Sequence, residues 1–172
     1  SINYVFFYLS NTYLISAFPA VVFSTVIIMN ILGENFYFKK KPSIKTLFGA
    51  TIGMLGIAII FNDEIFNFNL SNGTHIGLLL ALLGTFFAST GNLVYQRNLN
   101  HNFPLIETLA YAMLYGSLVT FLITQIKDTE LLFEYSFEYI ISLSYLSIVG
   151  SIFAFIFYLR LIEKVGPGRA GY

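Results

Sequence analysis

The chain has 172 residues, of which 56% are hydrophobic and 10% are charged. Since a soluble globular domain carries about 25% charged residues, this composition leaves too little charge to cover a surface in water. Nine cations balance nine anions, so the net charge gives no steering toward nucleic acid, and the lack of cysteine excludes disulfides and thiolate catalysis.

Apolar runs long enough to span a membrane follow one another along the chain. Crossing a hydrocarbon core about 30 Å thick takes about 20 apolar residues in a helix. After the end of a helix over residues 2–9, we predict five spans: Tyr13–Leu32, Ile44–Phe61, His75–Tyr95, Leu105–Ile126 and Tyr139–Leu159. Pro19 is expected to kink the first of these helices, because it removes a hydrogen bond.

These runs are apolar all round, whereas the helices of a soluble protein keep a polar face. The sequence therefore predicts an all-α, polytopic integral membrane protein that packs as a helical bundle in a lipid bilayer. Small residues four apart, as at Gly77 and Ala81 or at Gly49 and Gly53, predict close approach of helices within it.

The loops between these spans alternate in charge. Eight of the nine basic residues fall in or beside loops 33–43, 96–104 and 160–171, and only Lys127 lies on the opposite side. The opposite loops hold carboxylates, among them Asp63, Glu64, Asp128, Glu130, Glu134 and Glu138. The positive-inside rule assigns the basic loops to the cytoplasm, which favours the plasma membrane, the inner membrane of a bacterium.

The lysine run in "GENFYFKKKPSIK" suits a nucleic-acid patch when it is taken alone. Its place between two uncharged spans instead favours a cytoplasmic anchor, with Phe36 near the lipid headgroups. No nucleic-acid partner is predicted.

A weak repeat relates the two ends of the chain. An offset of 150 residues places Phe157-Tyr158-Leu159 on Phe7-Tyr8-Leu9. This offset covers five spans, and an odd number of spans turns the second copy upside down. Inverted repeats are typical of secondary transporters, whose substrate sites lie between the two halves.

Four stretches carry a resemblance to a known family. They are "FFYLSNTYLISAFPAVVFSTVIIMNILGE" (6–34), "LFGATIGMLGIAIIF" (47–61), "IGLLLALLGTFFASTGNLVYQRN" (76–98) and "YLSIVGSIFAFIFYLRLIEKVGPGRAGY" (145–172). Together they resemble the EamA-type branch of the drug/metabolite transporter superfamily. The resemblance implies ten spans in two inverted five-helix repeats with cytoplasmic termini.

The resemblance also implies a division of the chain. Residues 1–61 would be the C-terminal part of the first repeat, from the end of its third helix to its fifth. Residues 62–74 would be an outer loop, and residues 75–172 would hold helices six to eight and the start of helix nine. We expect the chain to be part of a longer protein, since "GPGRAGY" resembles a helix start with no helix after it.

Polar side chains inside the spans are the candidates for a substrate cavity. They are Ser24, Thr25, Asn30, Ser89, Asn92, Tyr111, Tyr115, Ser144 and Tyr158. An unsatisfied polar group in hydrocarbon is costly, so each should face a wet cavity or another helix, and helix-to-helix hydrogen bonding is the alternative for any one of them.

Two carboxylates also stand out. Glu107 lies within a predicted span and is a candidate for proton or cation coupling, the alternative being that it reaches the interface. Glu34, at the end of the Gly33-Glu34 pair, is expected to form an ion pair with Lys39 or Lys40.

The leading hypothesis is a secondary transporter that moves a small metabolite, such as an amino acid or a related compound, by alternating access. The alternatives are a polytopic enzyme acting on lipid and a non-transporting membrane scaffold. An enzyme needs a nucleophile, an acid-base pair or a metal. His75 and His101 are isolated, so we expect no catalytic residue, no metal and no cofactor. The sequence carries no signal for the oligomeric state.

Overall fold

The structure is a computed structural model that describes residues 2–15, 17–60, 62, 73–126 and 133–171. Throughout these residues every regular element is a helix, which confirms the all-α prediction. The elements are α1 (Ile2–Ser10), α2 (Ala17–Ser24), α3 (Val26–Phe38), α4 (Ile44–Ile60), α6 (Thr74–Asn100), α7 (Leu105–Ile126), α8 (Phe137–Tyr145), the π-helix η1 (Leu146–Phe153), α9 (Ala154–Val165) and α10 (Pro167–Ala170).

Four helical segments of the described chain are long and apolar enough to cross a membrane. They are Ala17–Phe38, Thr74–Asn100, Leu105–Ile126 and Phe137–Val165, while α4 is a shorter apolar helix of 17 residues. Each predicted span thus corresponds to a helix or to a run of consecutive helices. Of the predicted outer loop 62–74, residues 63–72 lie outside the described residues, as do Asp63, Glu64, Asp128 and Glu130.

Helices extend further than the apolar runs that predict them. The helix α3 continues to Phe38, α6 to Asn100 and α9 to Val165. The predicted loops 33–43, 96–104 and 160–171 are therefore too long, and the connections are residues 39–43, residues 101–104 and Gly166. The reason is that a helix ends where its backbone hydrogen bonds end, and polar residues continue those bonds beyond the apolar stretch.

The predicted kink at Pro19 is wrong. Pro19 lies in the first turn of α2, where its missing N–H removes no intrahelical bond. The helix is interrupted instead at Thr25, between α2 and α3. There the hydroxyls of Ser24 and Thr25 donate to the carbonyls of Val21 and Val22, each at 2.6 Å. Such back-bonding to the preceding turn is a known cause of helix bending.

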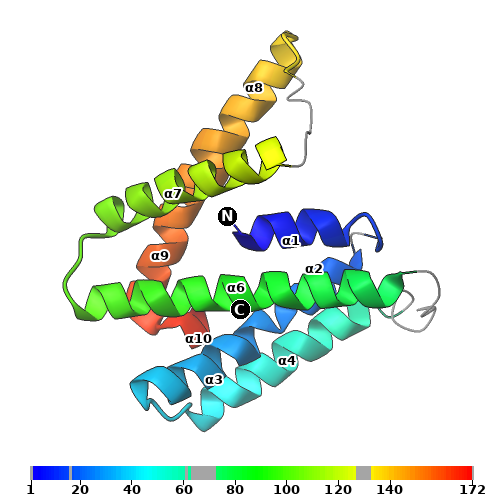
Figure 1. The fold of residues 1–172 in the computed structure, drawn as a ribbon. Coiled ribbons are helices and arrows are strands. Elements are labelled where there is room, and N and C mark those ends of the chain that lie inside the picture. The colour runs from blue at the N-terminus through cyan, green and yellow to red at the C-terminus, as the bar shows by residue number, and fades with distance from the viewer. Residues whose placement is uncertain (1, 16, 61, 63–72, 127–132, 172) are drawn as a thin grey trace.

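The longest helix, α6, is the centre of the arrangement and packs against α1, α2 and α3 (Figure 1). Its small residues allow the close approach. A Cβ at Gly77 would lie 2.6 Å from Cγ of Leu14, and one at Gly84 would lie 3.2 Å from the carbonyl oxygen of Asn3. The stripe predicted along this helix is therefore a packing surface.

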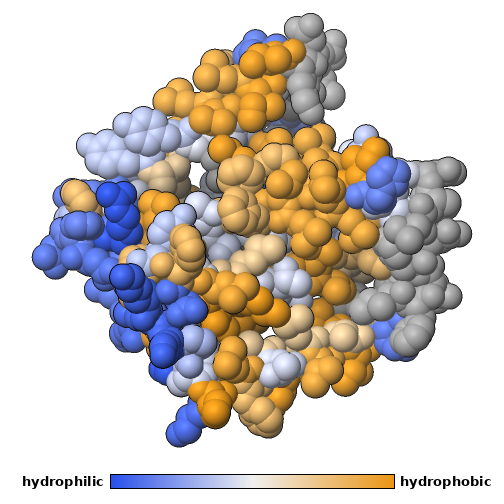
Figure 2. Space-filling view, turned by 60° about the horizontal axis from the view of Figure 1, so that its bottom comes forward, coloured by the Kyte–Doolittle hydropathy of each residue, from blue (hydrophilic) through white to orange (hydrophobic). Residues whose placement is uncertain are grey.

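The short connections gather at one end of the bundle. Residues 39–43 and 101–104 lie on the left of Figure 1, and Lys40, Gln96 and Gly166 line one recess there. In Figure 2 hydrophilic side chains gather on this left side, next to a largely apolar surface. At the opposite end, Gly73 contacts Tyr13 in the turn after α1.

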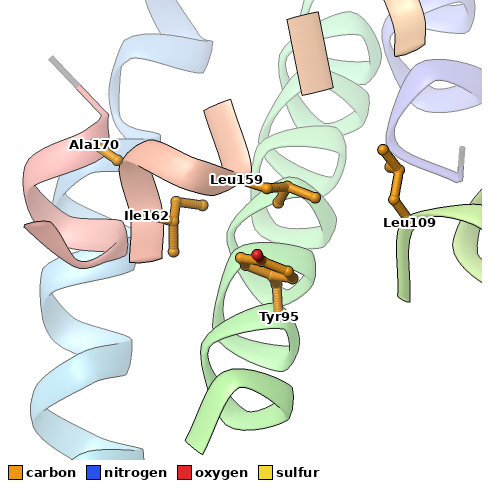
Figure 3. Packing of buried hydrophobic residues seen from close by; sticks show 5 residues of the cluster. All are labelled: Tyr95, Leu109, Leu159, Ile162 and Ala170. Carbon is orange, nitrogen blue, oxygen red and sulfur yellow. The ribbon is translucent and has the colours of Figure 1, made fainter. Parts of the chain in front are cut away.

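Two small clusters form the buried core. One consists of Tyr95, Leu109, Leu159, Ile162 and Ala170, which converge between α6, α7, α9 and α10 (Figure 3). The other consists of Val26, Ile27, Ile31 and Ala50. Large apolar side chains outside them face outward, such as Ile59 at 74% and Ile126 at 82% exposure. A continuous apolar surface of this kind suits contact with lipid.

Candidate functional site

Three of the candidate residues meet in one hydrogen-bond network. Asn30, on α3, is fully buried, and its Nδ2 donates to the carbonyl of Pro167 at 3.0 Å. Asn92, on α6, donates from Nδ2 to the hydroxyl of Tyr158 at 2.9 Å and to Oδ1 of Asn30 at 3.5 Å. The network joins α3, α6 and the adjacent pair α9 and α10, which are three separate parts of the chain.

Glu34 belongs to the same region, and its partner differs from the prediction. Instead of an ion pair with Lys39 or Lys40, its Oε2 accepts a hydrogen bond from the backbone N–H of Gly168 at 3.0 Å. The N–H groups that begin a helix have no partner within it, so a carboxylate there satisfies one of them. The charges of Lys40 and Arg169 are close enough to act on the carboxylate.

A cavity of about 1040 Å³ lies beside this network. Its walls come from α1, α2, α6, α7, η1, α9 and α10. Four tyrosines line it, Tyr4, Tyr95, Tyr111 and Tyr158, together with four phenylalanines, Phe23, Phe87, Phe103 and Phe155. The remaining polar lining consists of Asn3, Thr90, Asn92, Asn98, Glu107 and Thr108.

The structure places four of the predicted residues on this wall: Asn92, Tyr111, Tyr158 and Glu107. Glu107 lies in the first turn of α7 and is exposed, close to the connection from α6. Asn98, Phe103 and Pro104 also line the cavity, so it reaches the end of the bundle where the basic connections gather.

The other predicted residues lie elsewhere. Asn30 is buried in the network, and Ser89 is buried on α6. The hydroxyls of Ser24 and Thr25 return to carbonyls of their own helix, as described above. Tyr115 stacks on Tyr111, with 6.3 Å between ring centroids, and is exposed, and Ser144 is exposed on α8.

Tyr95 is a polar wall residue that the sequence reasoning missed. It is 4% exposed, and its hydroxyl has no hydrogen-bond partner among the described residues. A buried hydroxyl in this state is costly, and its oxygen is covered by protein, so Tyr95 meets the cavity with its ring. Its spacing in the sequence could have indicated it, because Tyr95 lies three residues after Asn92 and so on the same helix face.

The lining has the composition of a ligand-binding site. Ligand sites of this size are mostly apolar and aromatic, with a few polar groups that fix orientation. The described residues contain no group of three or more His, Cys, Asp or Glu side chains that would hold a metal ion.

The fold and the cavity together define a polytopic helical membrane protein with a binding site between its helices. A sequence model of the EamA-like transporter family matches residues 75–172, more than half of the chain. The chain belongs to the EamA-like transporter family of membrane permeases, as the resemblance implied, and it is an integral membrane protein. No match to a curated protein or to a solved structure was found.

Proposed function

We propose that the protein is a secondary transporter that moves a small metabolite, an amino acid or a related compound, by alternating access. The observation that carries this proposal is the composition of the cavity wall. Asn3, Tyr4 and Phe23 come from the first part of the chain, and the rest comes from α6 onward. A site between two halves that rock against each other is the arrangement on which such transport depends.

The two halves correspond, in this proposal, to parts of two inverted five-helix repeats. Residues 1–61 belong to the first repeat, residues 62–74 join the two, and residues 75–172 begin the second. Two observations support the division. The family match covers residues 75–172, and the basic connections gather at one end of the bundle. With that end in the cytoplasm of a cell whose plasma membrane holds the protein, the cavity faces inward.

The residues on the cavity wall and in the network have distinct roles in this proposal. Asn92, Tyr111 and Tyr158 orient the substrate, because they present an amide and two hydroxyls to the cavity. Glu107 is the group that couples transport to a proton or a cation, since it is the carboxylate on the wall. Asn30 positions Asn92 and the start of α10. Ser24, Thr25, Ser89, Tyr115 and Ser144 stay candidates for walls that form in another conformation.

The proposal is tested by reconstitution of the full-length protein into vesicles and by uptake or exchange assays over a panel of metabolites, with and without a proton gradient. We expect uptake of at least one compound class above protein-free vesicles. Transport of no compound under either condition would contradict the proposal.

Asn92→Leu tests the site itself. We expect at least about a tenfold lower uptake, since the loss of hydrogen bonds from one polar group is worth about one factor of ten or more. Ser117→Ala is the matched control, because Ser117 is exposed on α7 and its hydroxyl bonds only the carbonyl of Leu114. Equal uptake by both variants would remove Asn92 from the substrate site.

A further inference from the structure

The charge on the cavity wall has one sign. Glu107 is its carboxylate, and the described lining contains no lysine, arginine or histidine. The cations at the same end of the bundle, Lys40, Lys41, Lys164 and Arg169, line a separate recess of about 290 Å³. A negatively charged ligand would therefore enter this cavity without a cationic partner, and an unpaired charge away from water is costly.

The aromatic wall acts in the same direction. The face of an aromatic ring carries negative electrostatic potential and attracts a cation within about 6 Å of its centre. Tyr111 lines the cavity one helical turn after Glu107 on α7, and Tyr115, which lies outside the lining, stacks on Tyr111. The carboxylate is therefore accompanied by a ring on the same helix face.

Hydroxyl oxygens on the cavity wall favour the same kind of ligand. The hydroxyl oxygen of Tyr158 accepts a hydrogen bond from Asn92 and keeps a second lone pair, and Thr90 and Thr108 add hydroxyl oxygens to the wall. An ammonium group has three donors and no acceptor, so oxygens with free lone pairs match it. A carboxylate would meet amide and hydroxyl donors on this wall, but no positive charge among the described lining residues.

We propose that the cavity takes a protonated organic amine with an aromatic or apolar body, in preference to the corresponding amino acid, with Glu107 as the partner of the ammonium group. This inference rests on the proposed function, because it names the substrate class of the same cavity. The apolar body lies against the phenylalanine and tyrosine rings, and the charge lies toward the end that carries Glu107.

The first test compares three ligands that share one phenyl ring. Equilibrium binding to the full-length protein in detergent is measured for phenethylamine, phenylalanine and 3-phenylpropionate. We expect phenethylamine to bind at least about tenfold more tightly than the other two. Phenylalanine adds a carboxylate to the amine, and 3-phenylpropionate has a carboxylate in place of the amine, and neither carboxylate has a cationic partner on the described wall. Equal or tighter binding of phenylalanine or 3-phenylpropionate would overturn the proposal.

The second test changes the protein. Glu107→Gln keeps the shape of the side chain and removes its charge, and we expect phenethylamine binding to weaken about tenfold or more. Glu138→Gln is the matched control, since Glu138 lies on α8 away from the cavity, and its binding should equal that of the unmodified protein. Unchanged binding by Glu107→Gln would remove Glu107 from the ammonium site.

Counterflow of the same labelled compounds in vesicles separates this inference from the proposed function. Transport of phenylalanine but not of phenethylamine would leave a transporter and refute the amine class. Selective binding of phenethylamine without transport of any compound would support the ligand class and refute the transport function.

Discussion

Among single residues, Glu34 links two parts of the chain that are 134 positions apart. Its carboxylate is the acceptor for the N–H of Gly168, a buried residue at the start of α10. There is also no room for a side chain at that position, since a Cβ on Gly168 would collide with Oε2 of Glu34. The start of α10 therefore depends on an acceptor supplied by α3.

Glu34→Ala is expected to lower the free energy of unfolding by about 1–3 kcal/mol, because it leaves a buried N–H without a partner. Glu34→Gln retains an amide oxygen that accepts the same bond, so it should recover most of the loss. The measurement is the thermal unfolding of the full-length protein in detergent. Equal stability of Glu34→Ala and the unmodified protein would contradict the assigned bond, and equal losses in both variants would show that charge is what matters.

The polar candidates illustrate how far single residues can be predicted. Asn30, Asn92 and Tyr158 stand out in the sequence because an amide or hydroxyl in an apolar run needs a partner. Their partners could not be predicted, because Asn30 and Pro167 are 137 positions apart and meet only through the packing of α3 on α10. The predicted partner of Glu34 was wrong for the same reason. The lysines lie close to it in sequence, whereas Gly168 is 134 positions away.

At the scale of elements, the contact between α1 and α6 depends on small residues. Gly77 lies against the turn that follows α1, where Leu14 is buried. Gly53, on α4, has no atom within 4 Å of the position that a Cβ would take. Both glycines lie inside helices, so they form a matched pair that differs in its surroundings.

Gly77→Ala is expected to destabilise the protein by about 1–3 kcal/mol, because the added methyl group overlaps Leu14 and Tyr13 and the turn after α1 must move away from α6. Gly53→Ala should be neutral or stabilising by up to about 1 kcal/mol, since alanine favours a helix over glycine. Thermal unfolding of both variants in detergent decides between these outcomes. A loss in Gly53→Ala as large as in Gly77→Ala would mean that neither effect comes from helix contact.

The positions of helices follow from the sequence more closely than their ends do. The prediction for Leu105–Ile126 agrees with α7 at both ends. Pro104 directly precedes the helix, and the apolar run is as long as the helix itself. The ends of α3 and α9 were placed too early, since Glu34 and Arg160 are polar but remain helical. The break at Thr25 was missed because it depends on hydroxyl bonds to carbonyls, which hydropathy does not contain.

For the whole molecule, topology is the property with the sharpest test. The basic connections share one end of the bundle, and the turn at Asn11 lies at the other, with Tyr13 beside Gly73. The chain has no cysteine, so each introduced cysteine is the one reactive thiol within these 172 residues.

Lys40→Cys is expected to react with a membrane-impermeant thiol reagent only from the cytoplasmic side, and Asn11→Cys only from outside, because the positive-inside rule places Lys40 in the cytoplasm. Labelling of intact cells against opened cells measures this. Both sites are exposed in the structure, so the described residues do not cover either of them. Labelling of Lys40→Cys in intact cells would reverse the proposed orientation.

The π-helix η1 has a consequence for the face that α8 presents. Ser144 and Tyr158 lie fourteen residues apart, close to four turns of about 3.6 residues, so a continuous α-helix would point both side chains in nearly the same direction. The wider turns of η1 lie between them, marked by the bond from Oγ of Ser151 to the carbonyl of Leu146, five residues back. These turns change the angular phase, so the two side chains point in different directions, and of the two Tyr158 lines the cavity. A pore-lining pattern counted from the sequence at α-helical pitch therefore loses its register on crossing residue 146.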